Sequence, residues 1–172
     1  MTSLTCPLSV GGGVLWLGAP PNPGGRGIAL AADHIALHPI DAAMEKVPWD
    51  AVRGLSVTIE ISRWRHPALA SWTLGMLGAA VDIFSPGVPD DIDVHIDTVD
   101  GPIEHAVSAH NRGGYPRDKV EALIALLGLL VADDNVRASL QSPEDVKDAF
   151  NCASVAVNKG ESPTTVLLSL VA

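Results

Sequence analysis

Val47-Pro48-Trp49-Asp50-Ala51-Val52 stands between two short strand-like runs and a longer one that follows it. Pro48 lacks a backbone N–H, which costs nothing just ahead of a strand. Asp50 is expected to cap a short helical turn that begins at Ala51. A break of this kind is typical of the corner between strands in a small barrel or sandwich. The stretch therefore predicts a sheet on both sides of it and makes the later helix a cap.

The run from Gly54 to Ser62 is the clearest strand, because apolar and polar residues alternate strictly along it. Two short strands are expected at residues 28–31 and 34–38, around a tight turn. A second hairpin is expected over residues 91–108, with a two-residue turn at Asp100-Gly101. The inward positions predicted for the long strand are Leu55, Val57, Ile59 and Ile61.

The strongest predicted helix runs from Pro116 to about Ala132, with a favourable proline in its first turn. Its apolar residues lie almost all the way round, so we expect neighbours to cover it on more than one side. Asp133 or Asp134 is expected to cap a second helix that ends near Leu140. A third helix, preceded by Ser142 and Pro143, is expected to end near Phe150.

About seven antiparallel strands followed by a helix predict an α+β fold. We expect a flexible lead-in at residues 1–13 and a main domain at 14–132 that contains an apolar insertion at 63–84. A helical extension is expected at 133–150. The tail, 151–172, stays ambiguous, because its last residues are apolar and β-prone.

Composition excludes several classes of protein. The hydrophobic content of 47% and a mean hydropathy of +0.26 exclude a disordered chain, and 172 residues are enough to bury a core. A net charge of −9 argues against a nucleic-acid binder, which needs a basic face. Cys6 and Cys152 are the only cysteines, and no secretory signal precedes them, so we expect free thiols and a cytoplasmic location.

The order of these elements resembles the pleckstrin-homology-like superfold, including its GRAM and bacterial branches. The resemblance covers residues 12–132 and rests on the hairpin at 27–38, the corner at 47–52 with its following strand, the hairpin at 91–108 and the helix at 116–132. It implies a bent antiparallel sheet or barrel closed by a C-terminal helix. Members of that superfold bind phosphoinositides, peptides or protein surfaces, so the resemblance by itself assigns no ligand.

Asp91, Asp93, His95 and Asp97 recur at every second position, so they share one face of a strand. Such side chains are typical ligands of divalent metals. The competing interpretation is a solvated outer face, since a straight strand spaces these residues about 7 Å apart and metal ligands must converge. We favour the outer face and predict no metal, no cofactor and no catalytic residue. If the two-residue turn holds, His105 lies on the inner face, opposite Ile96.

Arg63-Trp64-Arg65 precedes an uncharged run, residues 68–81, that contains Trp72. Two guanidinium groups around an indole suit an anionic lipid headgroup, with the apolar run in the membrane interface. The competing interpretation pairs the arginines with the seven acids between Asp82 and Glu104. The apolar run then packs on the body of the protein or on a second subunit.

The leading hypothesis is a non-catalytic binding or scaffold module that contacts a protein partner and self-associates into a homo-oligomer. Self-association would use residues 68–81 or the broad apolar helix. The predicted binding residues are Arg63, Trp64, Arg65 and Trp72. A peripheral membrane module that binds anionic lipid is the alternative, and a metal-dependent enzyme that uses Asp91, Asp93, His95 and Asp97 is the second alternative.

Overall fold

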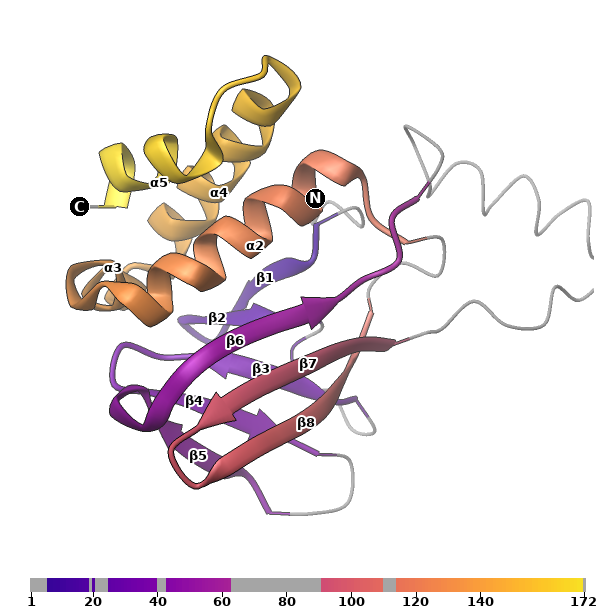
Figure 1. The fold of residues 1–172 in the computed structure, drawn as a ribbon, viewed down its shortest axis with the longest axis vertical. Coiled ribbons are helices and arrows are strands. Elements are labelled where there is room, and N and C mark those ends of the chain that lie inside the picture. The colour runs from indigo at the N-terminus through magenta and orange to yellow at the C-terminus, as the bar shows by residue number, and fades with distance from the viewer. Residues whose placement is uncertain are drawn as a thin grey trace, which may run out of the picture.

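The computed structural model describes residues 6–18, 20, 25–39, 43–62, 91–109 and 114–171. Within these residues lie eight strands in two antiparallel sheets, followed by helices. The prediction of an α+β fold is confirmed, with eight strands rather than about seven. The two sheets lie one behind the other, and the helices cover one end of them (Figure 1).

Sheet A is a meander of five strands in chain order, and its first strand corrects the predicted lead-in. Leu8 pairs with Leu17 across a hairpin. Gly12 and Gly13, which suggested a flexible segment, both have positive φ and form the turn of this hairpin. The strands are β1 (Leu8–Gly11), β2 (Val14–Leu17), β3 (Gly27–Leu30), β4 (His34–His38) and β5 (Glu45–Pro48).

The predicted corner joins the two sheets. A 3-10 turn, η1 (Trp49–Ala51), connects β5 to β6, and no side chain caps it, so the cap expected from Asp50 is absent. Trp49 is only 4% exposed and donates from Nε1 to the Ala31 carbonyl at 2.7 Å. Sheet B then follows, with strands β6 (Val52–Thr58), β7 (Asp91–Thr98) and β8 (Gly101–Ser108).

The first strand of sheet B ends earlier than the alternation predicts. Leu55, Val57 and Ile59 pack against the core, as expected, but Ile61 is 49% exposed. The reason is that the chain leaves the ladder after β6 and forms a parallel bridge with Tyr115 instead. The Tyr115 amide donates to the Glu60 carbonyl at 3.0 Å, and the Ser62 amide donates to the Tyr115 carbonyl at 2.9 Å.

The β7–β8 hairpin has a different register from the one that Asp100-Gly101 predicted. Thr98 pairs with Gly101, so the turn residues are Val99 and Asp100. The Thr98 hydroxyl fixes this turn, because it donates to the Gly101 carbonyl at 2.6 Å and accepts from the Asp100 amide at 3.3 Å. The shift is even, so His105 stays on the inner face, opposite Val94 rather than Ile96.

Four α-helices follow in the described part of the chain. The first two agree with the prediction, and Asp133 caps the second by accepting from the Asn135 amide at 2.8 Å. The third continues well past Phe150, and no side-chain cap forms at Ser142. The tail is helical because packing of Leu167 overrides its β propensity. The helices are α2 (Arg117–Ala132), α3 (Asp134–Ala138), α4 (Pro143–Asn158) and α5 (Pro163–Val171), with the 3-10 turn η2 (Ser139–Gln141) after α3.

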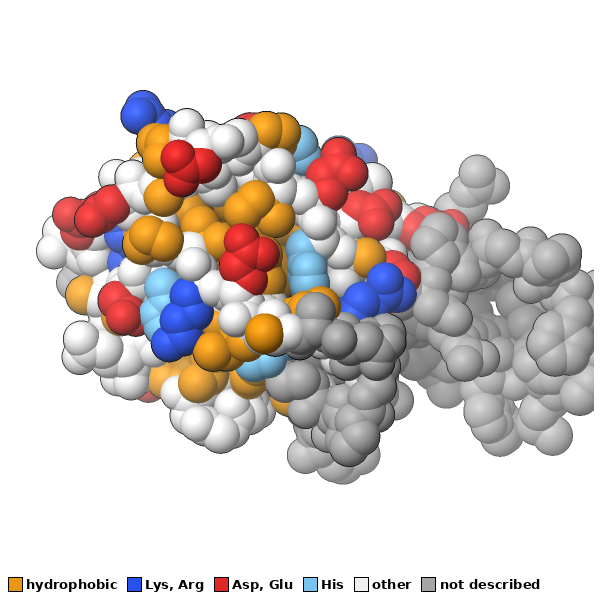
Figure 2. All heavy atoms as spheres, turned by 90° about the horizontal axis from the view of Figure 1, so that it is seen from below, with side chains coloured by type: hydrophobic (Ala, Val, Ile, Leu, Met, Phe, Trp, Pro, Cys, Tyr) orange, Lys and Arg blue, Asp and Glu red, His pale blue; other side chains and the backbone are white. Residues whose placement is uncertain are grey.

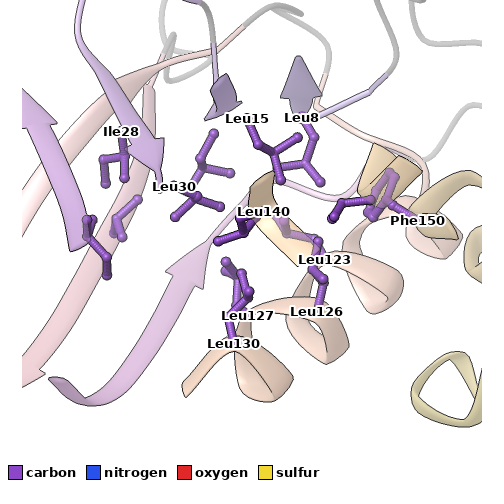
Figure 3. Close-up of a cluster of buried hydrophobic side chains, with 14 of the residues drawn as sticks. Leu8, Leu15, Ile28, Leu30, Leu123, Leu126, Leu127, Leu130, Leu140 and Phe150 are labelled. Carbon is purple, nitrogen blue, oxygen red and sulfur yellow. The ribbon is translucent and has the colours of Figure 1, made fainter. Parts of the chain in front are cut away.

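One hydrophobic core joins the sheets and the helices. Leu8 and Leu15 of sheet A meet Leu123 of α2, Leu140 of η2 and Phe150 of α4 (Figure 3). Helix α2 contacts β6 on one side and α4 and α5 on another, which explains why it is apolar nearly all round. None of the helices that the structure describes is long and apolar enough to cross a membrane.

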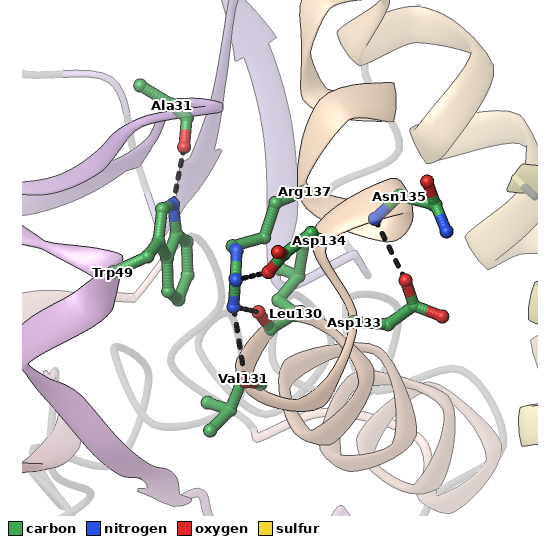
Figure 4. A network of polar contacts seen from close by, with 8 residues as sticks. All are labelled: Ala31, Trp49, Leu130, Val131, Asp133, Asp134, Asn135 and Arg137. Carbon is green, nitrogen blue, oxygen red and sulfur yellow. Dashed lines mark hydrogen bonds and ion pairs between the residues drawn. The ribbon is translucent and has the colours of Figure 1, made fainter.

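A polar cluster attaches the corner to the end of α2. Arg137 donates from Nη1 to the Leu130 and Val131 carbonyls at 3.1 and 3.2 Å, and it also pairs with Asp134. These are carbonyls that the last turn of a helix leaves without partners. The same guanidinium lies over the ring of Trp49 (Figure 4).

Candidate binding surface

The outer face of sheet B carries polar side chains in rows that cross its three strands. The middle row consists of Ser56, His95 and Glu104, which are direct cross-strand partners. In the next row, Asp93 lies between Thr58 and Ala106. This face is opposite the one that packs on the core, because Ile92, Val94 and Ile96 point inward and are at most 1% exposed.

An open hollow of about 630 Å³ lies over these rows. Its lining combines hydroxyl, carboxylate and imidazole groups. The lining residues are Ser56, Thr58, Asp93, Val94, His95, Glu104, His105 and Ala106.

His95 lies between two carboxylates. Its Nε2 is 3.1 Å from Asp97 Oδ1, and its Nδ1 is 3.9 Å from Glu104 Oε1. A general base for a serine nucleophile needs one ring nitrogen on the hydroxyl and the other on an acid. Both nitrogens of His95 face acids, so the arrangement gives no activation to the neighbouring Ser56.

The predicted metal set does not come together. Asp91, on β7, forms an ion pair with Arg26, the residue before β3, with Oδ2 2.5 Å from Nη2. Asp93, His95 and Asp97 stay along one strand, as the competing interpretation expected. Among the described residues, no group of three or more His, Cys, Asp or Glu side chains is arranged to hold a metal ion.

Three exposed carboxylates, on β7 and β8, give the outer face its acidic charge. Asp93 is exposed, and the side chains of Asp97 and Glu104 are 59% and 88% exposed. Within the described residues, none of these three carboxylates forms an ion pair with a lysine or an arginine. The face therefore presents a local negative potential to any partner.

The predicted binding residues Arg63, Trp64, Arg65 and Trp72 lie outside the described residues, as do the rest of the segment 63–90, His66 and His110. Their proposed contacts with lipid or with a second subunit therefore stay predictions.

The two edge strands β5 and β8 leave the sheets open at the end opposite the helices. Seen from that side, hydrophobic side chains gather in the middle, with acidic groups and histidines among and around them (Figure 2). His105, on β8, interacts with Arg26, His38 and Glu45 at or near the strands of sheet A. Burial lowers its pKa, and the Arg26 guanidinium lowers it further.

The two cysteines have different surroundings. Cys6 is buried and Cys152 is exposed, and both are free thiols. Burial raises the pKa of the Cys6 thiol above its ordinary value of 9.0.

No family model, curated protein or solved structure matches the chain. Function must therefore be inferred from the surface itself.

Sequence reasoning found the β7 side chains of this surface but missed their neighbours. Ser56, Thr58 and Glu104 reach the hollow only because of the strand register. The predicted hairpin register places Ala106 opposite His95, whereas the real one places Glu104 there. A local signal for the real register was present in the sequence. A threonine before a two-residue turn can form hydrogen bonds with the turn backbone, as Thr98 does in the run Thr98-Val99-Asp100-Gly101.

Proposed function

We propose that this protein is a non-catalytic binding module whose outer face of sheet B takes a basic segment of a partner protein. The observation that supports this most directly is the set of carboxylates on this face, Asp93, Asp97 and Glu104, none of which pairs with a lysine or an arginine among the described residues. Lysine and arginine side chains of a partner would supply the missing positive charge. The hydroxyls of Ser56 and Thr58 would accept hydrogen bonds from the partner's backbone or donate hydrogen bonds to it.

A binding role is favoured over catalysis by the contacts of His95. Its nitrogens both face carboxylates, and Asp91 is engaged by Arg26. Neither a nucleophile–base pair nor a converging ligand set is therefore available on this face.

We also propose that the fold is a variant of the pleckstrin-homology-like architecture. Two successive antiparallel sheets and a following helix support the resemblance. The five-and-three division of strands and the three helices after α2 depart from it.

Self-association remains part of the proposal chiefly through residues 68–81. Helix α2, the other candidate, is covered by β6, α4 and α5 except on the side of Ile124, which is 55% exposed. Like charges on the outer face of sheet B oppose pairing of two such faces. They also disfavour contact of this face with anionic lipid, so lipid binding through Arg63 and Arg65 stays an independent alternative.

The test is a titration with a lysine- and arginine-rich peptide at physiological salt, followed by amide chemical shifts. We expect shifts on β6, β7 and β8 and an affinity that falls as salt rises. The double variant Asp93→Asn with Glu104→Gln should weaken binding. The matched control, Glu144→Gln with Asp145→Asn on α4, removes the same charge from exposed residues elsewhere.

If both double variants weaken peptide binding equally, the interaction depends only on the net charge of the protein. That result would overturn the proposed surface. Absence of binding by the wild type would do the same. Flotation with vesicles that contain anionic lipid tests the alternative. Binding that is lost on Arg63→Ala with Arg65→Ala would favour a membrane role.

A further inference from the structure

Besides the corner at η1, the two sheets meet at a junction formed by Arg26, His105 and Ser108. The Arg26 amide donates to Ser108 Oγ at 3.2 Å, and the Ser108 amide donates to the Arg26 carbonyl at 3.0 Å. These bonds tie the residue before β3 to the last residue of β8. The contact is close, because a Cβ added at Gly18 would lie 2.2 Å from Val107 Cγ1.

Two buried nitrogens at this junction have no hydrogen-bond partner. They are Arg26 Nε and His105 Nε2, and no other side-chain nitrogen or oxygen of the described residues is buried in this state. Arg26 Nε always carries a proton, so it is an unpaired donor. Leaving a buried donor unpaired carries a penalty that native proteins usually avoid.

The state of the imidazole decides whether a second unpaired donor is added. A hydrogen bond to the Gly27 backbone favours a proton on the His105 ring. Nε2 has no partner, so in the tautomer that donates from Nδ1 to the Gly27 backbone the neutral ring keeps Nε2 as a bare acceptor. Protonation converts Nε2 into a second buried donor of the junction, and in the closed state neither Nε2 nor Arg26 Nε has an acceptor.

The charges around His105 come from several elements. Arg26, before β3, and His38, on β4, oppose a positive charge on the ring, whereas Glu45, on β5, favours it. Asp91, on β7, neutralises the far side of Arg26. Burial and the two basic neighbours outweigh Glu45, so the neutral ring is the form that fits the closed junction.

We propose that protonation of His105 opens this junction, so that mild acid releases the end of β8 from the start of β3 while the helices and the rest of sheet A stay folded. Opening admits water to Arg26 Nε and His105 Nε2 and supplies the missing acceptors.

The test is native-state hydrogen exchange of the Ser108 amide between about pH 7 and pH 5, corrected for the intrinsic exchange rate. We expect the opening equilibrium to rise about tenfold for each pH unit below 6.5, the ordinary pKa of a histidine, until the lowered pKa of His105 in the closed junction is reached, because opening takes up one proton in that range. Amides of the β3–β4 ladder should not follow this change.

The variant His105→Gln cannot take up the proton, so its Ser108 amide should exchange independently of pH after correction. The control His34→Gln removes a histidine that is bound to Asp33, away from the junction, and should retain the acid response. If His105→Gln does not fold, the proposal is tested on the wild-type protein alone. Nitrogen signals of the His105 ring and the Ser108 exchange must then share one midpoint. Separate midpoints, or an acid response that survives in folded His105→Gln, would overturn the proposal.

Discussion

The Arg137 guanidinium lies over the indole of Trp49, 5.9 Å from the ring centroid. Trp49 belongs to the corner between the two sheets, and Arg137 belongs to the helix after α2. The side chain of Arg137 is only 14% exposed, so its charge is held in a partly desolvated position. This contact, together with the carbonyls of Leu130 and Val131, attaches the sheet corner to the helical layer.

Replacing Arg137 should loosen that attachment. The variant Arg137→Met keeps an aliphatic stem but loses the bonds to two α2 carbonyls and the contact with Trp49. We expect a loss of about 2 kcal/mol in the free energy of unfolding, measured by urea denaturation. The control Arg53→Met changes an exposed arginine on β6 and should alter stability by no more than about 0.5 kcal/mol. Equal effects would show that the cluster contributes nothing.

Comparing alanine substitutions at two glycines distinguishes the cost of backbone strain from the cost of close packing. Gly18 and Gly160 have nearly the same φ, +80° and +79°, but only Gly18 has neighbours where a Cβ would lie. Gly160→Ala should therefore lose about 1 kcal/mol from strain alone. Gly18→Ala should lose clearly more, since Val107 and the Ser108 carbonyl must move as well. Thermal unfolding of the two variants makes the comparison. Equal losses would mean that the packing around Gly18 yields freely.

The last helix is expected to contribute to the core mainly through Leu167, with Val166 and Val171 partly buried against it. Leu167 is fully buried, whereas Leu170, on the same helix, is 54% exposed. We expect Leu167→Ala to lower the free energy of unfolding by about 2–4 kcal/mol because it leaves a cavity. Leu170→Ala should change it by less than about 0.5 kcal/mol. Chemical denaturation measures both. Similar values for the two variants would contradict the packing of α5 on the core.

The two thiols should react at different rates with a thiol reagent. In the folded state, a thiol reagent should modify Cys152 quickly and Cys6 only after unfolding. Cys152→Ser should remove the fast phase, and a fast phase that remains would place Cys6 at the surface.

The pH dependence of Cys6 has a definite sign. Its folded pKa is raised above 9.0, so the folded state holds the proton to higher pH than the unfolded state. The resulting stabilisation is complete below pH 9.0 and is lost as pH rises toward the folded pKa. Cys6→Ala should flatten this alkaline decline in urea denaturation, and an unchanged decline would exclude the thiol as its cause.

Local patterns predicted the elements whose signals are short-range. The corner at Trp49 was predicted because proline and a polar residue interrupt two strand patterns. Helix α2 was predicted because its apolar positions recur with helical spacing. The role of Gly12 and Gly13 as a hairpin turn was missed, because a glycine run is compatible with both a turn and a flexible segment.

What sequence reasoning could not supply were contacts between distant segments. Nothing local indicates that Arg26 meets Asp91, or that Leu167 overrides the strand propensity of its own segment. The candidate surface depended on the same kind of information. Its acids on β7 were visible in the alternation, but Glu104 and Ser56 joined them only through register.

Strand β1 has a consequence for how the chain folds. It contacts α4, and Leu8 shares a core with Phe150, although these residues are separated by most of the sequence. A ribosome synthesises β1 long before it synthesises α4, so the nascent sheet must wait with an uncovered apolar face. Such long-range closure is slow. The interval between the synthesis of β1 and that of α4 is therefore when this protein depends most on protection from aggregation.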